Sequence, residues 1–221
     1  MVTTVLSNSG YKFKKCEVGP RIVQEITQEL TVSPYVPGDF GKAKVTKFKL
    51  YLESPNKLYV PRFYGQEKLG LATETKLSEG EPIHIDFNGS LRPEQEPIEE
   101  LYLNSARDIG GGLISLKCGG GKTVLALHII SVLKVKTIVV VHKDFLMTQW
   151  RDRIREFLPE ATIGKVQQDT IDIEGKDIVL AMVQSLSKKE YMPGTFSSFG
   201  FAVFDECHHL GAEVFHKSMT K

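Results

Sequence analysis

The sequence predicts an α/β protein in which a parallel sheet with crossover helices follows a smaller α+β domain. From residue 101 onward, short apolar runs alternate with helical segments, which is the rhythm of parallel sheets. A glycine-rich stretch joins one of these runs to a helix within residues 113–125. Before residue 80 the pattern differs, because one amphipathic helix is followed by strand-like alternation.

Length and charge support two domains. The 221 residues are 41% hydrophobic and 25% charged, with a net charge of +1, as in an ordinary soluble protein. Residues 1–80 carry 12 Lys and Arg against 8 Asp and Glu, whereas residues 81–221 carry 16 against 19. We expect a small basic domain over 1–86 and a second domain over 87–221, divided within the Gly-, Pro- and charge-rich stretch at 77–95.

In the first domain, residues 21–31 space their apolar side chains as a short amphipathic helix does, and the turn-rich stretch after them ends it. Residues 42–63 alternate like strands around a turn at 54–56. Phe48, Leu50 and Leu52 would then share one face of a strand, opposite Lys47, Lys49 and Tyr51.

In the second domain, four apolar runs suit buried strands. They are residues 112–116, 137–141, 177–183 and 201–205, and residues 122–134 form a helical segment after the first of them. Parallel sheets place their ligand sites at the carboxyl ends of the strands. The chemistry is therefore expected just after these runs.

The cysteines, the longest apolar stretch and the first residues of the chain predict its cellular setting. The three cysteines lie far apart and lack metal-ligand spacing, which indicates a reducing compartment. The longest apolar stretch, 124–142, is interrupted by His128, Lys134 and Lys136, so no membrane span is expected. The first residues lack the order of a secretory signal. We expect an intracellular protein, cytoplasmic or nuclear.

The stretch "KCGGGKT" at 117–123 has the chemistry of a phosphate-binding loop. Gly119, Gly120 and Gly121 allow backbone N–H groups to turn toward phosphate oxygens, and the following helix adds partial positive charge. Lys122 supplies a full charge for the β- and γ-phosphates, and the Thr123 hydroxyl is placed to bind Mg²⁺. These residues predict an ATP site.

An acidic pair supplies the other half of such a site. The run 201–204 ends in Asp205 and Glu206. We assign Asp205 to Mg²⁺, which it would hold through water. Glu206 is assigned to orient and deprotonate the attacking water.

Residues 205–208, Asp-Glu-Cys-His, resemble the D-E-x-H box of superfamily 2 helicases and translocases. The phosphate-binding loop of that family also has the pattern x-x-G-x-G-K-T, and its motor is a RecA-like P-loop domain. The resemblance implies that "LRPEQ" at 91–95 reads adenine, with Gln95 on the base edge and Arg92 near it, and that Cys118 lies in the ATP loop. It also implies that His208 couples the ATP site to a second domain.

The same resemblance implies nucleic-acid contacts at two strand ends. "VVVHKDFLMTQW" at 139–150 and "VLAMVQSLSK" at 179–188 are similar to the family's backbone-contacting elements. The contacts would be His142, Lys143, Gln149, Gln184 and Ser185. Trp150, which sits among apolar residues, is expected in the core instead.

Within the superfamily the pattern looks most like XPB-type helicases and DNA helicases of large viruses and phages, which implies a DNA-dependent ATPase acting with Mg²⁺, and DNA rather than RNA as partner. The family has a second RecA-like domain whose arginines contact the transferring phosphate, and such an arginine contributes roughly 10³–10⁵ in rate. We therefore expect residues 1–221 alone to bind ATP weakly and hydrolyse it poorly.

Three questions stay open at this stage. Lys47 and Lys49 belong to a basic strip that would contact DNA or simply protect a sheet edge; otherwise residues 1–80 would bind a protein partner. Cys118 and Cys207 are expected to be small buried side chains. The alternatives to a helicase are a double-strand translocase subunit that does not unwind, and an accessory nucleic-acid-binding protein.

Overall fold

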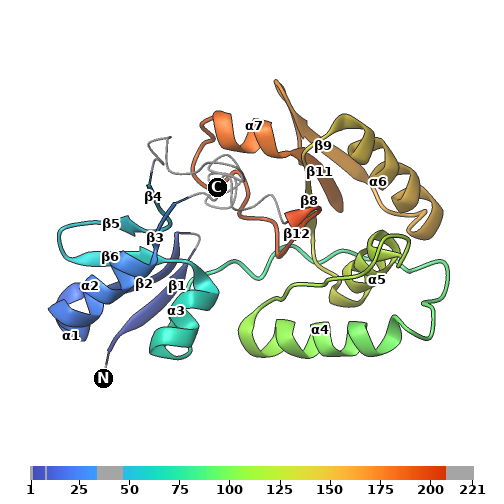
Figure 1. The fold of residues 1–221 in the computed structure, drawn as a ribbon. Coiled ribbons are helices and arrows are strands. Elements are labelled where there is room, and N and C mark those ends of the chain that lie inside the picture. The colour runs from blue at the N-terminus through green and yellow to red at the C-terminus, as the bar shows by residue number, and fades with distance from the viewer. Residues whose placement is uncertain (1, 8, 34–46, 208–221) are drawn as a thin grey trace, which may run out of the picture. The chain divides into compact units, whose positions relative to one another are not determined.

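The computed structural model describes residues 2–7, 9–33 and 47–207, and these divide into two compact units between Leu77 and Ser78 (Figure 1). Residues 78–86, which the sequence analysis assigned to the first domain, are therefore grouped with the second unit. Ile83 and Ile85 belong to the hydrophobic core of that unit. None of the helices in these described ranges combines the length and the apolar character that a membrane span requires.

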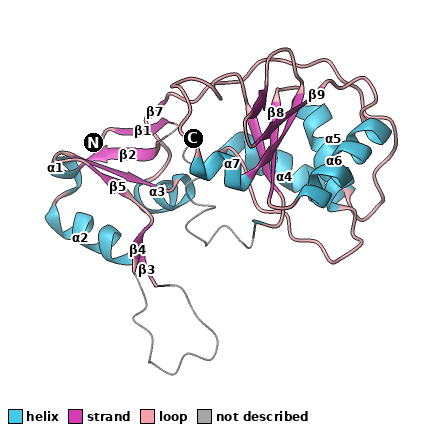
Figure 2. Cartoon of the chain, turned by 90° about the horizontal axis from the view of Figure 1, so that it is seen from above, coloured by secondary structure: helices cyan, strands magenta, loops and turns pink. Residues whose placement is uncertain are grey.

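The first unit is a mixed sheet with short helices (Figure 2). Its sheet has the order β5-β6-β2-β1-β7, in which only β1 and β7 pair in parallel. A separate pair is formed by β3 and β4. The elements are β1 (Thr4–Ser7), β2 (Gly10–Lys14), α1 (Lys15–Val18), α2 (Pro20–Glu29), β3 (Thr31–Val32), β4 (Phe48–Lys49), β5 (Leu52–Glu53), β6 (Lys57–Val60), α3 (Arg62–Leu69) and β7 (Glu74–Thr75).

One face of this sheet forms the core of the first unit. Leu6, Tyr11 and Phe13 alternate along the β1–β2 hairpin with residues on the opposite face, as the two-residue period of a strand requires. They pack with Ile26 of α2 and with apolar residues of β6. The Tyr11 hydroxyl, buried with its ring, donates a hydrogen bond of 2.9 Å to the Gly70 carbonyl oxygen.

The predicted helix at 21–31 is confirmed as α2, which begins at Pro20. The predicted strand before residue 54 is interrupted by a bend at residues 50–51, and residues 42–46 lie outside the described ranges. Because of this bend the predicted faces are wrong at two positions. Tyr51 is buried, whereas Leu52 is 56% exposed.

The turn predicted at residues 54–56 is confirmed, since β5 and β6 pair on either side of it. The second predicted strand is right only as far as Val60. Pro61 follows, and helix α3 begins directly after it. Proline lacks a backbone N–H and therefore suits the start of a helix better than the interior of a sheet.

The second unit is the predicted parallel sheet with helices. Its order is β10-β9-β11-β8-β12, and β9, β11, β8 and β12 are all parallel. The elements are α4 (Glu96–Ile109), α5 (Lys122–Leu133), β8 (Thr137–Val141), α6 (Asp144–Phe157), β9 (Ile163–Gln167), β10 (Thr170–Asp172), β11 (Ile178–Met182), α7 (Val183–Lys188) and β12 (Phe201–Phe204). The predicted strands at 137–141, 177–183 and 201–205 and the helix at 122–134 are confirmed.

The predicted strand at residues 112–116 is wrong. These residues are extended but pair with no strand among the described residues, and Leu113 is 76% exposed. The Ser105 hydroxyl donates a 2.7 Å hydrogen bond to the Gly111 carbonyl oxygen and so ties the segment to α4. A five-residue apolar run is compatible with either a strand or an extended loop, and periodicity alone does not distinguish them.

The core of the second unit lies between its sheet and the helices α5 and α6. Every residue of β8 and β11 is buried, as expected of central parallel strands covered on both faces. Helix α6 contributes Met147, Trp150 and Ile154, spaced three and four residues apart along one side.

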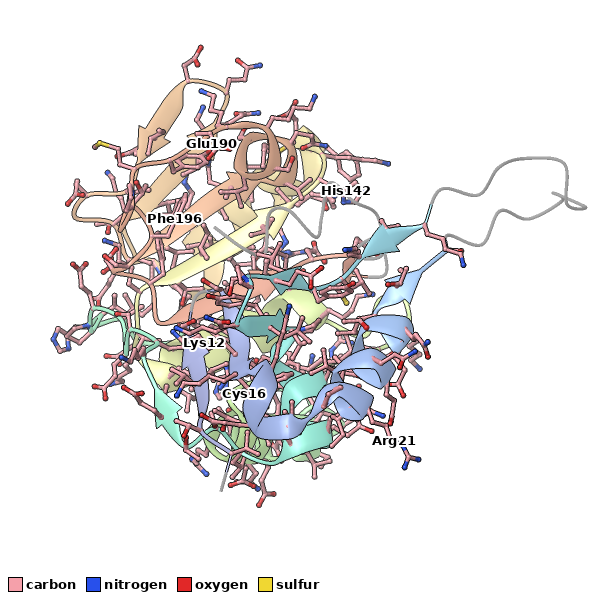
Figure 3. All side chains as sticks on the ribbon, turned by 90° about the vertical axis from the view of Figure 1, so that its left-hand side faces the viewer. Lys12, Cys16, Arg21, His142, Glu190 and Phe196 are labelled. Carbon is pink, nitrogen blue, oxygen red and sulfur yellow. The ribbon has the colours of Figure 1, made fainter. Side chains whose placement is uncertain are left out.

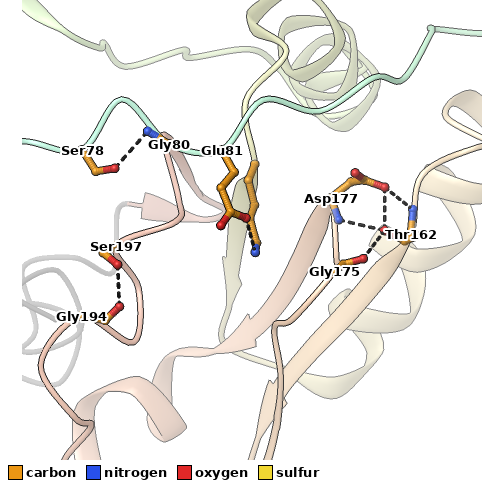
Figure 4. Close-up of polar contacts among 9 residues, drawn as sticks. Ser78, Gly80, Glu81, Thr162, Gly175, Asp177, Gly194 and Ser197 are labelled. Carbon is orange, nitrogen blue, oxygen red and sulfur yellow. Dashed lines mark hydrogen bonds and ion pairs between the residues drawn. The ribbon is translucent and has the colours of Figure 1, made fainter.

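Polar contacts join the residues at the amino-terminal ends of the strands of this sheet (Figure 4). The Asp177 carboxylate, just before β11, accepts hydrogen bonds from the Thr162 N–H (2.7 Å) and hydroxyl (2.6 Å), just before β9. Lys136 is only 3% exposed, and its ammonium group lies 2.9 Å from the Glu81 carboxylate. The Lys136–Glu81 pair fastens residues 78–85 to the start of β8, and the Asp177–Thr162 bonds join the starts of β11 and β9.

Substituting Gly65→Ala should destabilise the first unit by about 1–3 kcal/mol, the usual cost of overpacking. A Cβ atom at Gly65 would lie 2.4 Å from ring carbons of the buried Tyr11. This clash outweighs the gain of about 1 kcal/mol that alanine brings to a helix interior. Urea unfolding is followed by circular dichroism and by the fluorescence of the single tryptophan, Trp150, in the second unit.

The matched control is Glu67→Ala, an exposed position of the same helix, which should change stability little. Gly65→Ala should lower the dichroism midpoint while leaving the Trp150 transition in place. A Gly65→Ala chain that is as stable as the Glu67→Ala chain would show that the packing against Tyr11 is wrongly described.

Candidate nucleotide and nucleic-acid site

The parallel pairing gathers three strand ends at one edge of the second sheet. Val141 of β8 lies opposite Met182 of β11, and Phe204 of β12 lies opposite Val140. Residues that directly follow β8, β11 and β12 are therefore neighbours, although they are up to about sixty positions apart in the chain. This edge is where the predicted site residues at 142–143, 184–185 and 205–206 are found.

Helix α5 brings the glycine loop to the same edge. The helix is about 18 Å long at about 1.5 Å per residue, and only residues 134–136 separate its end from β8. Since Leu127 and Ile130 pack against Val139 and Val141, the helix runs back along the sheet. Its first residue, Lys122, therefore lies toward the carboxyl ends of the strands.

The glycine loop is shaped by two side chains from residues 91–95. The Gln95 amide nitrogen donates to the carbonyl oxygens of Gly120 (3.1 Å) and Gly121 (3.2 Å), and its oxygen accepts from the Arg92 N–H (2.9 Å). The Arg92 guanidinium donates to the Gly119 carbonyl oxygen at 3.2 Å. The carbonyl oxygens of three successive glycines thus accept hydrogen bonds from the residues just before α4.

Gly121 is the loop position at which a side chain would be both strained and obstructed. Its φ of 77° lies in the left-handed region, and a Cβ atom there would come within 2.6 Å of the Gln95 amide nitrogen. Gln95 itself is only 2% exposed. Its amide shapes the loop in this structure, and the predicted contact with adenine stays a prediction.

The residues present fit a magnesium nucleotide. Lys122 is exposed at the first turn of α5, and Thr123 beside it is half-buried. A helix N-terminus attracts phosphate through its unpaired N–H groups and its dipole. Mg²⁺ prefers hydroxyl, carboxylate and phosphate oxygens, and Thr123 and Asp205 supply the first two kinds.

Asp205 follows β12, and both of its carboxylate oxygens are held. Oδ1 accepts the Glu206 backbone N–H at 3.0 Å, and Oδ2 accepts the indole N–H of Trp150 at 2.8 Å. Its own N–H donates to the Val140 carbonyl oxygen at 3.1 Å. Glu206 adopts a φ of 55°, a left-handed conformation that costs a non-glycine residue about 1–2 kcal/mol and that clusters at functional sites.

The remaining residues of the box are only partly described. His208 lies outside the described residues. The expectation that both cysteines are buried is wrong, because Cys118 is exposed in the loop and Cys207 is half-buried. Cys118 follows residues 112–117, which pair with no strand among the described residues.

The predicted nucleic-acid residues meet at the ends of β8 and β11. The Gln184 amide nitrogen donates to the His142 carbonyl oxygen at 3.0 Å, so the start of α7 is joined to the residues after β8 (His142 is labelled in Figure 3). Lys143 is exposed, and its ammonium group lies 5.7 Å from the centre of the Phe145 ring. Phe145 is 56% exposed and adds an aromatic surface that the sequence analysis did not single out.

Ser185 and Gln149 differ in their access to a ligand. Ser185 is buried, and its hydroxyl accepts the Gln168 backbone N–H at 2.9 Å, so this side chain has an internal role here. Gln149 is exposed on α6 and is free of such packing. Trp150, next to it, is buried as predicted.

The basic strip of the first unit is partly neutralised. The Lys49 ammonium group lies 3.1 Å from the Glu53 carboxylate, and this hydrogen bond raises the pKa of Lys49. Lys47 is exposed just before β4. These two residues therefore offer less net positive charge than the sequence suggested.

The chain is similar to a known protein family and to several curated proteins. The family model described as "Type III restriction enzyme, res subunit" matches residues 88–221. A mimivirus protein, "Putative ATP-dependent RNA helicase L396" of Acanthamoeba polyphaga mimivirus, is 33% identical over 218 residues, covering 97% of this chain and 42% of that protein. "DNA 3'-5' translocase XPB2" of Sulfurisphaera tokodaii is 33% identical over 127 residues, covering 56% of this chain and 26% of that protein.

Among solved structures, the "Sulfolobus solfataricus SWI2/SNF2 ATPase core in complex with dsDNA" superposes with a TM-score of 0.50 at 20% identity, covering 64% of this chain and 31% of that chain. At this identity the likeness supports the fold. The chain spans between about a quarter and a half of the length of these curated relatives. It belongs to the type III restriction enzyme res-subunit family, and its second unit is a RecA-like motor domain of the superfamily 2 helicases and translocases.

Proposed function

We propose that residues 87–221 bind Mg-ATP at the glycine loop and couple its hydrolysis to movement on nucleic acid. One observation carries this proposal. Helix α5 presents the Lys122 end of the glycine loop toward the sheet edge at which Asp205 follows β12. A phosphate cradle and a positioned carboxylate at one edge are what phosphoryl transfer needs.

Each residue has a chemical role in this proposal. The loop N–H groups and Lys122 bind the β- and γ-phosphates, while Thr123 and Asp205 hold Mg²⁺, Asp205 through water. The ion, when bound, neutralises charge that develops on the phosphate oxygens. Glu206 orients and deprotonates the attacking water. His208 would connect this chemistry to another domain.

Turnover in this proposal depends on more than these 221 residues. The chain covers 42% of its mimivirus relative and 26% of the archaeal translocase. In phosphoryl transfer an arginine from a second domain contributes roughly 10³–10⁵ in rate. We therefore propose weak ATP binding and slow hydrolysis by residues 1–221 alone.

The nucleic-acid track would cross the same edge through His142, Lys143, Gln149 and Gln184. Phe145 fits this role as well, because exposed aromatic rings stack on bases while nearby cations follow the backbone. We favour DNA over RNA on the similarity to XPB-type proteins. Two alternative functions are movement along duplex DNA without unwinding and an accessory nucleic-acid-binding role.

The first unit offers a basic face that suits a nucleic-acid backbone. Lys12, Lys14 and Lys57 line a hollow of about 90 Å³ on the sheet face opposite the core (Lys12 is labelled in Figure 3). Lys14 and Lys57 lie directly across from each other in the β2–β6 register. Like charges in that arrangement destabilise a sheet, although Glu17, 3.1 Å from Lys14, offsets part of the repulsion.

Edge protection does not explain these lysines. Strand β2 lies in the middle of the sheet, between β6 and β1, so its backbone groups are already paired. A bound phosphate would relieve the repulsion between Lys14 and Lys57. We therefore propose that this face, rather than Lys47 and Lys49, contacts the nucleic-acid backbone.

Substituting Lys122→Ala should weaken binding of the non-hydrolysable analogue Mg-AMP-PNP about 10- to 100-fold. This is the loss expected for a hydrogen bond to a charged group, about 1.5–3 kcal/mol. Isothermal titration calorimetry on the 221-residue chain measures it. Lys117→Ala, an exposed lysine just before the glycines, is the matched control and should bind normally. Equal affinities for the two variants would contradict the role of Lys122.

Neutralising the basic face should weaken binding to DNA and reduce its salt dependence. For Lys12→Gln with Lys57→Gln, two fewer phosphate contacts should lower the slope of log K against log salt by about 1.8. Fluorescence anisotropy with single-stranded, duplex and forked DNA and with single-stranded RNA, at two salt concentrations, provides the measurement.

The double variant Lys47→Gln with Lys49→Gln removes the same charge from the strip that the sequence predicted. A larger loss in this second variant would move the contact there. If neither variant changes the affinity of a chain that binds nucleic acid, the first unit lies off the track and a protein partner becomes its expected ligand.

A further inference from the structure

We propose that Trp150 is a positioning residue for Asp205 and that its indole N–H sets the orientation in which that carboxylate receives the metal. This inference rests on the proposed nucleotide function and names a residue that neither the sequence pattern nor the phosphate chemistry assigns. Trp150 is the single tryptophan of the chain and is 3% exposed. Its Nε1 nitrogen donates a hydrogen bond to Asp205 Oδ2 at a nitrogen–oxygen distance of 2.8 Å.

The donor is held rigidly. Trp150 belongs to the core cluster with Met147 and Ile154 of its own helix and with Val139 and Val141 of β8. A ring enclosed on these sides has little freedom to turn. The N–H therefore points at a fixed place, which is the condition for a group that orients another.

The acceptor is held from two directions. Trp150 donates to Oδ2, and the Glu206 N–H donates to Oδ1, while the Asp205 N–H is fixed on Val140. A carboxylate has about four lone-pair sites, so two remain for water molecules of a hydrated metal. Removing the indole donor would free the carboxylate to turn about its side-chain bonds and would blur where those two sites point.

A purely structural explanation is that Asp205 merely satisfies a buried indole N–H, because such groups usually find a partner. The two explanations predict different results. If the bond only stabilises the fold, its loss changes stability and leaves the metal dependence of nucleotide binding alone. If it orients the carboxylate, metal dependence changes even in a folded chain. Donors that orient metal ligands typically contribute 10- to 100-fold in metal affinity.

The test compares Trp150→Phe with a chain in which Trp150 is replaced by benzothienylalanine, which keeps the shape of the ring but has sulfur in place of the N–H group. AMP-PNP is titrated by calorimetry over a range of Mg²⁺ concentrations. We expect both variants to bind AMP-PNP without Mg²⁺ as the unmodified chain does, and to need about 10- to 100-fold more Mg²⁺ for the metal-dependent gain. Ile154→Val, a buried change in the same cluster, should leave this dependence unchanged.

A spectroscopic readout accompanies the titration. With one tryptophan, the chain gives one indole N–H signal in a ¹H–¹⁵N spectrum. That signal should move when Asp205→Asn is introduced, and should move in the unmodified chain when Mg-AMP-PNP binds but not with AMP-PNP alone.

The outcomes separate the two proposals. If the unmodified chain binds AMP-PNP with no gain from Mg²⁺, the proposed function fails and this inference fails with it. If it binds with a normal gain and the benzothienylalanine chain shows the same Mg²⁺ dependence, only the role of Trp150 is overturned. A shift in metal dependence equal to that of Ile154→Val would also overturn it, as a general effect of core packing.

Discussion

The pairing of β8 with β11 on one side and β12 on the other is the constraint on which the site depends. All five residues of β8 are buried, so the strand has no free face on which it could shift without exposing apolar side chains. Its register places Val141 opposite Met182, and Val140 opposite Phe204. A slip of one residue would turn every side chain of a strand to the other face. The core thus fixes which residues emerge together at the carboxyl edge.

The glycine loop reaches that edge by different means. Residues 112–117 do not form the expected strand, and no sheet partner among the described residues positions them. The loop is held by α5, which packs on the sheet, and by Gln95 and Arg92, which bind the carbonyl oxygens of the glycines. A buried glutamine amide that donates to two carbonyls is costly to disturb, because any bond it lost would leave a buried polar group unsatisfied. The segment predicted to contact adenine and the proposed phosphate loop are therefore joined by hydrogen bonds.

Sequence reasoning succeeded where a pattern was long or doubly constrained. The apolar runs of β8 and β11 and the long helical pattern after Gly121 each fit one kind of element, so these elements were predicted correctly. The acidic pair was placed at a strand end because it directly follows the apolar run of β12. The prediction was wrong at 112–116, where a run of only five residues was the basis for a strand. It was also wrong where a bend reversed the faces of Tyr51 and Leu52. The bond from Trp150 to Asp205 joins positions 55 apart. No spacing rule connects an apolar helix position to a distant strand end, so only the fold reveals that bond.

Helix α6 shows how one element serves both halves of the site. Its buried side carries Trp150 to the Asp205 carboxylate, and its exposed side presents Gln149 one residue earlier. The loop that starts it contains Lys143, and the carbonyl of His142 just before is bonded to Gln184. A displacement of this helix would therefore move the carboxylate proposed to hold the metal and the proposed nucleic-acid contacts together. Because energetic coupling between two ligands is reciprocal, a rigid helix that touches both places is the simplest physical route by which each could sense the other.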